Sequence, residues 1–322
     1  MKQESIIPKV VVSKCLGFDS CRYNGVTIPD PFVRKLEKFV EFIPVCPEVE
    51  IGLGVPRQPI RIVEQDKKKH LYQPATGKDV TRAMTEFTDN YLNGLEKVDG
   101  FLLKNRSPSC GINDTKIYYG FEKTAKTIRS KGFFGGVAAE IFEGYPIEDE
   151  GRLKNYVLRE QYLTALYAFA RFRKAVESSE INNVIEFHSA NKLLFMAYNQ
   201  TAMRAMGKIV ASYNKHNFKE VVDQYRKQLV RIFTSQLKPN SMINAFQHMF
   251  GGFSENLTAE ERQYFINTLE EYRDERVPAS VPIHLIRGWA VRFNLEYLLK
   301  QYILQPYPLE LLEVSDSGKG RI

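Results

Sequence analysis

Beyond Cys110, this 322-residue chain contains no cysteine. The four that exist are Cys15, Cys21, Cys46 and Cys110, and no two of them form a C-x2-C pair. Paired hooks of that kind are typical of structural zinc sites and of thiol-redox motifs, so their absence argues against both classes. Each cysteine lies in a short segment that contains Gly, Pro or Ser. This placement predicts one site assembled from three distant loops.

Long apolar runs are also missing. No stretch approaches the ~20 residues that cross a bilayer, and the apolar stretch near the N-terminus is too short for a signal peptide. We therefore expect a cytoplasmic protein without a membrane partner. In a reducing compartment, four cysteines suit metal binding or thiol chemistry better than structural disulfides. A further interpretation stays open, in which the cysteines are small buried hydrophobic residues.

The net charge of +7 is concentrated in one part of the chain. Residues 1–150 hold 22 Lys and Arg against 21 Asp and Glu, whereas residues 151–250 hold 15 against 6. Such an excess favours a polyanionic partner, most often nucleic acid, although a solvated helical surface is the alternative. Arg204 and Lys208 are four residues apart, so on a helix they share a face, where like charges repel each other unless a polyanion binds.

The first half alternates between strand-like and helix-like segments. Strands are expected at residues 9–13, 40–45 and 100–104, helices at 30–39, 81–95 and 116–131, and a loop or irregular hairpin at 65–76. This rhythm predicts an α/β fold, in which helices cover a parallel-type sheet. Ligand sites in such sheets form at the carboxyl ends of the strands. Because each cysteine segment follows a predicted strand, we expect all three at one sheet edge.

From about residue 155 the apolar period changes to that of a helix. Further helices are expected at 182–198, 200–214, 217–236, 240–250, 258–275 and 281–302, with a break at Asn199 or Gln200. Short loops between them favour antiparallel packing of neighbours. The sequence therefore predicts two domains, an α/β domain over residues 1–150 and an all-α domain over residues 151–322.

Three segments of the first half are SKCLGFDSCRYNG, PVCPEVEIGLGVPRQPI and LLKNRSPSCG. In order and spacing they resemble the motifs of the bacterial thiouracil desulfidase family, over roughly residues 8–150. The resemblance implies a [4Fe-4S] cluster that is held by Cys15, Cys46 and Cys110 and keeps one iron open. Cys21 also matches a cysteine of the pattern, but we do not expect it to be a ligand.

The same resemblance assigns the acid–base groups of the site. It implies that Glu48 is the catalytic carboxylate and Ser107 the catalytic serine, with Ser109 as a competitor for the second role. Without the resemblance, Glu48 also fits a surface carboxylate or a helix start, and Ser107 a turn. Nearby cations that can hold a substrate phosphate or orient the base, or can be plain exposed charges, are Arg57, Lys104 and Arg106.

The segment FHSANKLLFMAYNQTAMRAMGKIVA of the second half resembles a bacterial all-helical domain that occurs alone or fused behind the desulfidase domain. The two halves together resemble fused desulfidases that remove sulfur from 4-thiouridine in tRNA. In this half His188, Tyr198, Tyr213 and Tyr225 fit RNA contacts, but such residues at helical spacing are more typical of a core.

These resemblances imply a [4Fe-4S]-dependent desulfidase that converts 4-thiouridine in tRNA to uridine. The substrate sulfur would bind the open iron, and Glu48 would act as acid and base. Two alternatives stay open: a desulfidase of free thiouracil, and a non-catalytic, metal-containing RNA-binding protein. The sequence leaves the oligomeric state open.

Overall fold

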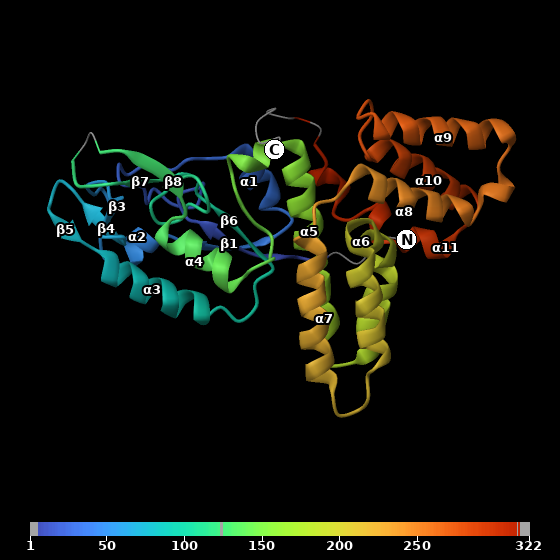
Figure 1. Cartoon of the computed structure of the whole chain (residues 1–322), viewed down its shortest axis with the longest axis horizontal. Coiled ribbons are helices and arrows are strands. Elements are labelled where there is room, and N and C mark those ends of the chain that lie inside the picture. Colours follow the sequence, from blue (N-terminus) through green and yellow to red (C-terminus); the bar gives the residue numbers. More distant parts are fainter. Residues whose placement is uncertain (1–5, 123–124, 314, 316–322) are drawn as a thin grey trace. The chain divides into compact units, whose positions relative to one another are not determined.

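The computed structural model describes residues 6–122, 125–313 and 315, and the chain forms two compact units (Figure 1). The N-terminal unit comprises Ile6–Ala170 with the described residues from Glu310 onward, and the C-terminal unit comprises Arg171–Leu309. The division falls inside helix α5 (Tyr156–Glu177). The boundary expected between residues 150 and 151 stays a prediction.

A four-stranded parallel sheet, sheet A, organises the N-terminal unit. Its strands lie in the order β2-β1-β6-β9 and are β1 (Lys9–Ser13), β2 (Glu41–Val45), β6 (Gly100–Leu103) and β9 (Ile147–Asp149). Val10, Val11 and Val12 of β1 are fully buried, as expected of a continuous β-branched run inside a parallel sheet. The predicted parallel sheet and its strands at 9–13, 40–45 and 100–104 are confirmed.

The helices of this sheet region are α1 (Pro31–Leu36), α2 (Pro47–Glu50), α3 (Thr81–Asn93) and α4 (Phe133–Ile141). Helix α1 begins after Asp30, whose carboxylate accepts hydrogen bonds from the backbone N–H groups of Phe32 at 2.9 Å and Val33 at 3.1 Å. Pro31 occupies the first helical position, where its missing N–H costs nothing. The helices predicted at 30–39 and 81–95 are confirmed, whereas α2 and α4 were not predicted.

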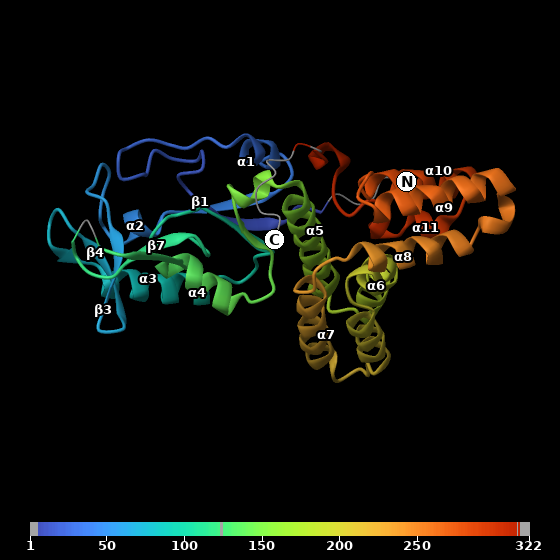
Figure 2. The same cartoon turned by 45° about the horizontal axis from the view of Figure 1, so that its top comes forward.

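A second sheet, sheet B, was not predicted. Its strands lie in the order β5 (Lys78–Asp79), β4 (Lys68–Gln73), β3 (Arg61–Gln65), β7 (Thr115–Tyr118) and β8 (Thr127–Ser130). Only the β3–β7 pair is parallel. Figure 2 shows β3, β4 and β7 beside α3 and α4. Residues 65–76, expected as a loop or irregular hairpin, supply β4 and a tight turn at Asp66 and Lys67, both with positive φ.

The helix predicted over residues 116–131 is wrong, because this segment forms β7, a connecting loop and β8. Lys116 is exposed and Ile117 is buried, which is the two-residue alternation of a half-buried strand. The pairing of β7 with β3 and the burial of Ile117 beside Met84 outweigh the local helical preference.

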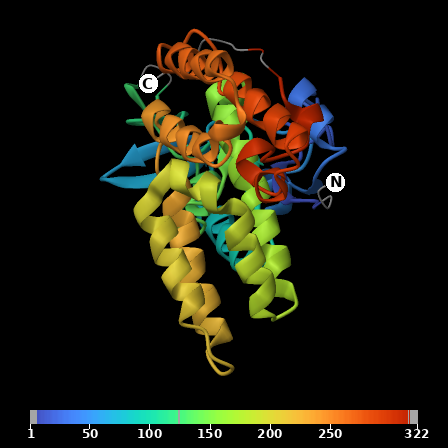
Figure 3. The same ribbon diagram turned by 90° about the vertical axis from the view of Figure 1, so that its right-hand side faces the viewer.

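The C-terminal unit is helical. Its helices after α5 are α6 (Ile181–Ala211), α7 (Phe218–Phe233), α8 (Pro239–Gly251), α9 (Ala259–Arg273), α10 (Ser280–Arg292) and α11 (Glu296–Leu299). Helix α6 is interrupted at Asn199, which has extended backbone angles, and the Asn199 side chain accepts a hydrogen bond from the N–H of Ala202 at 3.0 Å. The predicted break is confirmed. Figure 3 shows the second part of α6 beside α7 as a helical hairpin.

The single helix expected over residues 281–302 is wrong in its extent. Helix α10 ends at Arg292, and Asn294 adopts a left-handed conformation with a φ of 52°. The N–H of Leu295 then bonds to the carbonyl of Ala290 at 2.8 Å, which closes the helix end. In the described part of the chain, none of the helices combines the length and the apolar character that a membrane span needs.

Candidate active site

The carboxyl ends of the strands of sheet A carry the cysteine segments. Cys15 follows β1 by two residues, Cys46 directly follows β2 as the N-cap residue of α2, and Cys110 lies in the turn after β6. Because β2, β1 and β6 are parallel neighbours, their ends meet at one edge. All four cysteines are free thiols. The convergence that the sequence predicts is therefore present.

A cavity of about 390 Å³ opens at this edge. Its lining includes Cys15, Cys21, Cys46, Cys110, Glu48 and Ser107. The structure thus brings together the three predicted cluster ligands, Cys21, Glu48 and Ser107, from three segments of the N-terminal unit. Their chemical roles stay predictions.

The thiols interact with one another and are largely shielded from water. The hydrogen bond with Cys15, followed by burial, raises the pKa of Cys21 to about 11, while the hydrogen bond with Cys46 opposes this rise. The pKa of Cys46 is raised by its hydrogen bond with Cys21 and by burial. Burial raises the pKa of Cys110 to about 12, against the effect of hydrogen bonds with Ser13 and Ser107. Metal entry would therefore have to release protons from these thiols.

Ser107 shapes the turn that presents Cys110. Its hydroxyl oxygen accepts hydrogen bonds from the backbone N–H groups of Ser109 at 3.2 Å and Cys110 at 3.0 Å. Its carbonyl accepts a hydrogen bond from the hydroxyl of Thr115 at 2.8 Å. Ser107 is therefore a structural element of the turn, whatever further role it has in the cavity.

Helix α4 packs its first turn directly against this segment. The N–H groups of Phe134 and Gly135 donate to the carbonyl of Ser109 at 2.9 and 3.0 Å. A Cβ atom on Gly135 would lie 2.2 Å from the carbonyl oxygen of Cys110, so only glycine permits this approach. The sequence analysis missed this support. The paired glycines Gly135 and Gly136 in an apolar helical segment were the available signal.

Both oxygens of the Glu48 carboxylate accept hydrogen bonds. Arg57 donates to Oε2 from Nε at 2.9 Å and from Nη2 at 2.7 Å, and the hydroxyl of Ser109 donates to Oε1 at 2.7 Å. The Arg57 and Glu48 side chains are 4% and 14% exposed. Nη1 of Arg57 also donates to the carbonyl oxygens of Cys21 at 2.9 Å and Gly54 at 3.0 Å. Arg57 therefore ties Glu48 to the loop of Cys21.

The other two cations that the sequence singled out differ in their surroundings. Lys104 forms an ion pair with the buried carboxylate of Glu150, and its backbone N–H donates to the hydroxyl of Ser13 at 2.8 Å. Arg106 is largely exposed and pairs with Asp114 at 3.1 Å. Both line the cavity. The partner Glu150 lies 46 residues from Lys104, and no local pattern indicated it.

Thiols on three separate loops around one cavity suit a soft metal centre. In the described parts of the chain, no three His, Cys, Asp or Glu side chains are grouped so as to hold one metal ion. An iron–sulfur cluster has a different requirement, because its thiolates bind different irons and stand apart around the cluster. The donor set of Cys15, Cys46 and Cys110 therefore fits an iron–sulfur cluster.

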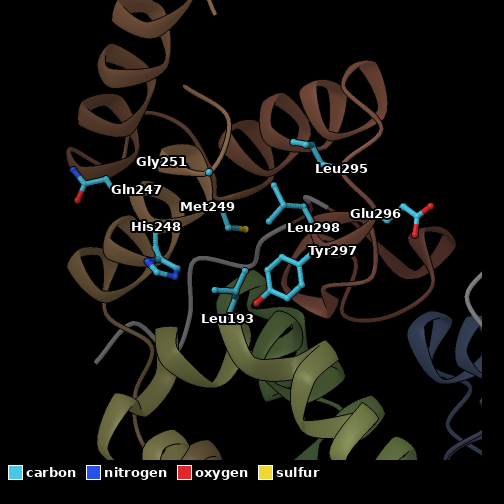
Figure 4. A pocket seen from close by; sticks show the side chains of 10 residues that line it. Leu193, Gln247, His248, Met249, Gly251, Leu295, Glu296, Tyr297 and Leu298 are labelled. Atoms are coloured by element: carbon cyan, nitrogen blue, oxygen red, sulfur yellow. The ribbon is translucent and has the colours of Figure 1, made fainter. Parts of the chain in front are cut away.

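The C-terminal unit contains a cavity of its own, of about 760 Å³. Figure 4 shows its lining, in which Leu193, Met249 and Leu298 come from three segments. Its titratable side chains are His248, Glu296 and Tyr297, and its lining holds no cysteine. This cavity does not offer the chemistry that the thiol site offers.

Tyr198 and Tyr225, which the sequence analysis considered more typical of a core than of RNA contacts, lie in the core of the C-terminal unit. Tyr225 is fully buried, and its hydroxyl lies 3.1 Å from Nδ1 of His188. Burial and the charge of Lys192 lower the pKa of His188. Tyr198 is also buried and packs against Phe233. These side chains stabilise the helical core and offer no stacking surface.

Comparison with known proteins gives both halves of the chain a relative. Residues 10–150 match the model of the 2-thiouracil desulfurase family, and residues 192–308 match that of a protein family of unknown function, DUF1722. The uncharacterized protein YbbK of Bacillus subtilis (strain 168) is 32% identical over 158 residues, which cover 45% of this chain and 98% of YbbK.

Two further relatives are more distant. The uncharacterized protein YbgA of Escherichia coli (strain K12) is 25% identical over 136 residues, which cover 42% of this chain and 80% of YbgA. The solved structure of the [4Fe-4S]-dependent thiouracil desulfidase TudS is 27% identical in sequence, with a TM-score of 0.36. The match covers 45% of this chain and 93% of the TudS chain. The family match and the identity to YbbK show that the chain belongs to the 2-thiouracil desulfurase family.

Proposed function

We propose that this protein is a [4Fe-4S]-dependent desulfidase that converts 4-thiouridine in tRNA to uridine. The observation that carries the proposal is the convergence of Cys15, Cys46 and Cys110 with Glu48 on one cavity, in a chain of the 2-thiouracil desulfurase family. The relative TudS bears the name of a [4Fe-4S]-dependent thiouracil desulfidase, which agrees with the proposed cofactor.

Cys15, Cys46 and Cys110 would hold the cluster. When bound by three protein thiolates, such a cluster supplies one iron without a protein ligand, which is a soft Lewis acid for sulfur. Cys21 lines the same cavity, and we propose that it stays a thiol beside the cluster. The count of protein ligands matters because a fourth thiolate would occupy the position that a substrate needs.

The reaction exchanges the thiocarbonyl sulfur for the oxygen of water and releases sulfide, with no net oxidation. Glu48 lies in the cavity wall and would take a proton from the attacking water and return it to the departing sulfur. Arg57 and Ser109 hold the Glu48 carboxylate in one orientation. Positioning of this kind lowers the barrier because the base need not reorganise as charge develops.

The helical hairpin of α6 and α7 supports tRNA as the substrate. Its exposed cations are Arg204, Lys208, Lys215, Lys219, Arg226, Lys227 and Arg231. In the described part of the chain, none of these seven takes part in an ion pair. Charges left without counterions on one hairpin favour a polyanion. The four free cysteines agree with a reducing compartment, so we place this reaction in the cytoplasm.

The test is anaerobic reconstitution of the full chain with iron and sulfide, followed by incubation with 4-thiouridine-containing tRNA and mass spectrometry of its nucleosides. We expect 4-thiouridine to disappear as uridine and sulfide appear. The matched control is Glu48→Gln, which should keep the cluster and lose about 10²- to 10⁴-fold in rate. A Glu48→Gln variant with full activity would instead contradict the assigned role of Glu48.

Two further arms of this experiment separate the alternatives. A desulfidase of free thiouracil would act on the free base and show no salt-dependent tRNA binding. Contact with tRNA predicts binding that weakens steeply as salt rises. A non-catalytic RNA-binding protein would bind tRNA in the same way but release no sulfide from either substrate.

A further inference from the structure

Sheet B has one face in the hydrophobic core. On that face Ile62, Leu71 and Ile117 pack with Val80 and Met84 at the start of α3. Side chains alternate between the two faces of a strand, so the residues next to these three lie on the opposite face. We call that opposite side the outer face of sheet B.

The strand register aligns a row of side chains across the outer face. Tyr72 lies opposite Arg61, and Lys116 lies opposite Arg129. The β3–β7 register, Ile62 with Ile117, continues by one residue to place Lys116 beside Arg61. The row across β4, β3, β7 and β8 is therefore one tyrosine followed by three cations.

The rings on this side are accessible rather than part of the core. Tyr72 is half-buried and meets Phe121 edge-to-face, with 4.7 Å between the ring centroids. The guanidinium of Arg61 lies 5.0 Å from the ring centroid of Tyr118. Phe121 is 44% exposed. Val63, which lies next to Ile62 on this side, is fully buried, and Arg61 donates a hydrogen bond to the carbonyl of Phe121, so the centre of the outer face is partly covered. Exposed cations beside an accessible ring are a surface that nucleic acids bind.

The net charge of residues 1–150 is close to zero, but the positive charges are concentrated around sheet B. Residues 61–79 and 114–131, which contain sheet B, together hold 10 Lys and Arg against 5 Asp and Glu. In the described part of the chain, five exposed lysines in or next to sheet B have no ion-pair partner: Lys68, Lys69 and Lys116 in its strands, Lys67 in the β3–β4 turn and Lys126 just before β8. Sheet B is thus a local concentration of positive charge within the N-terminal unit.

The outer face is also continuous with the mouth of the thiol cavity. Arg106 lines the cavity and pairs with Asp114, and Arg129 of β8 pairs with the other oxygen of the same carboxylate. Strand β3 begins four residues after Arg57, another lining residue. The ion pairs of Arg106, Asp114 and Arg129 therefore connect the cavity with the row of cations on the outer face.

We propose that the outer face of sheet B binds the sugar–phosphate backbone of the RNA whose thiolated base enters the cavity, an inference that rests on the proposed function. Lys68 and Lys116 act as point charges for phosphates, and the exposed ring of Phe121 offers a surface to a nucleotide that flanks the thiolated base. Charge complementarity and continuity with the cavity both select RNA. This surface belongs to the N-terminal unit, whereas the α6–α7 hairpin belongs to the C-terminal unit.

The test compares two double variants of the full-length, cluster-loaded protein. Lys68→Glu with Lys116→Glu reverses two outer-face charges. Lys38→Glu with Lys97→Glu makes the same change in net charge at exposed lysines outside sheet B. The readouts are the Kd for tRNA as a function of salt, and the kcat and KM of sulfide release from thiolated tRNA.

We expect the outer-face variant to bind tRNA about tenfold more weakly at ~0.1 M salt and to lose about 2 from its salt slope, one for each phosphate contact. Its kcat with saturating thiolated tRNA and its cluster content should match the wild type, which shows that the fold is intact. The control variant should bind tRNA within about twofold of the wild type.

Three results would overturn the inference. An outer-face variant with the wild-type Kd and salt slope would show that the lysines merely protect exposed strand edges. Equal weakening in both double variants would show a net-charge effect without a site. If the wild-type protein does not bind tRNA, RNA is not the partner of this face. By contrast, a wild-type protein that binds tRNA through this face but releases no sulfide contradicts the proposed function and leaves the surface intact.

Discussion

Arg57 holds one oxygen of Glu48 with two N–H groups, at 2.9 and 2.7 Å, and the other oxygen is held by Ser109. Arg57 also donates a hydrogen bond to the carbonyl of Cys21, so one buried guanidinium joins the proposed base Glu48 to the loop that contains Cys21. A planar fork of donors can do this, whereas the point charge of a lysine cannot.

Arg57→Lys should therefore lower kcat about tenfold or more while KM changes little, because the positive charge stays and the orientation of Glu48 is lost. Steady-state kinetics with thiolated tRNA measures both constants. Arg106→Lys is the matched control, since Arg106 lines the same cavity but is exposed. Equal losses of kcat in the two variants would contradict a positioning role for Arg57.

The two serines of the Cys110 turn should respond differently to removal of their hydroxyls. Ser109→Ala removes the donor to Glu48, so kcat should fall about tenfold with the iron content unchanged. Ser107→Ala removes the acceptor of two backbone N–H groups and should lower the free energy of unfolding by about 1–2 kcal/mol. Iron analysis, kinetics and denaturant titration separate these effects. Full activity of Ser109→Ala with loss of kcat in a fully folded Ser107→Ala would assign the catalytic role to Ser107.

The pKa of Asp149 gives a test that depends on pH. Burial raises this pKa to about 6, although a hydrogen bond from the N–H of Arg152 opposes the rise. The folded state therefore binds a proton more tightly than the unfolded state, whose Asp has a pKa of about 3.9. This contribution to stability is present below pH ~4 and is lost as pH rises to about 6.

Asp149→Asn should accordingly remove this slope and stabilise the N-terminal unit by roughly 1–3 kcal/mol at pH 7. Urea titrations of both proteins at several pH values from 4 to 7 measure the difference. A wild-type protein that gains stability with pH as steeply as the variant, or more steeply, would show that Asp149 is ionised in the fold.

Sheet A could be predicted because its signals are local and strong. The run of Val10, Val11 and Val12 is long enough in β-branched residues to specify a buried strand, and Asp30 with Pro31 marks a helix start by its own chemistry. Parallel strands share an edge, so the convergence of the cysteines followed from their positions in the sequence.

Sheet B and the partners of the site residues depend on contacts that are distant in sequence. β7 is only four residues long and becomes a strand by pairing with β3, more than 50 residues away. The choice between Ser107 and Ser109 depends on which hydroxyl meets Glu48, across a separation of 61 residues in the case of Ser109. Local propensity carries no information about such pairings.

The measurement that tests the central claim most directly is the iron and sulfide content of Cys21→Ser beside that of Cys110→Ser, both reconstituted anaerobically and then assayed with thiolated tRNA. Three ligands and one open iron predict about four irons and four sulfides per chain and full sulfide release for Cys21→Ser, and loss of both for Cys110→Ser. If Cys21→Ser loses its cluster as completely as Cys110→Ser does, the cluster has four protein ligands and the account is contradicted.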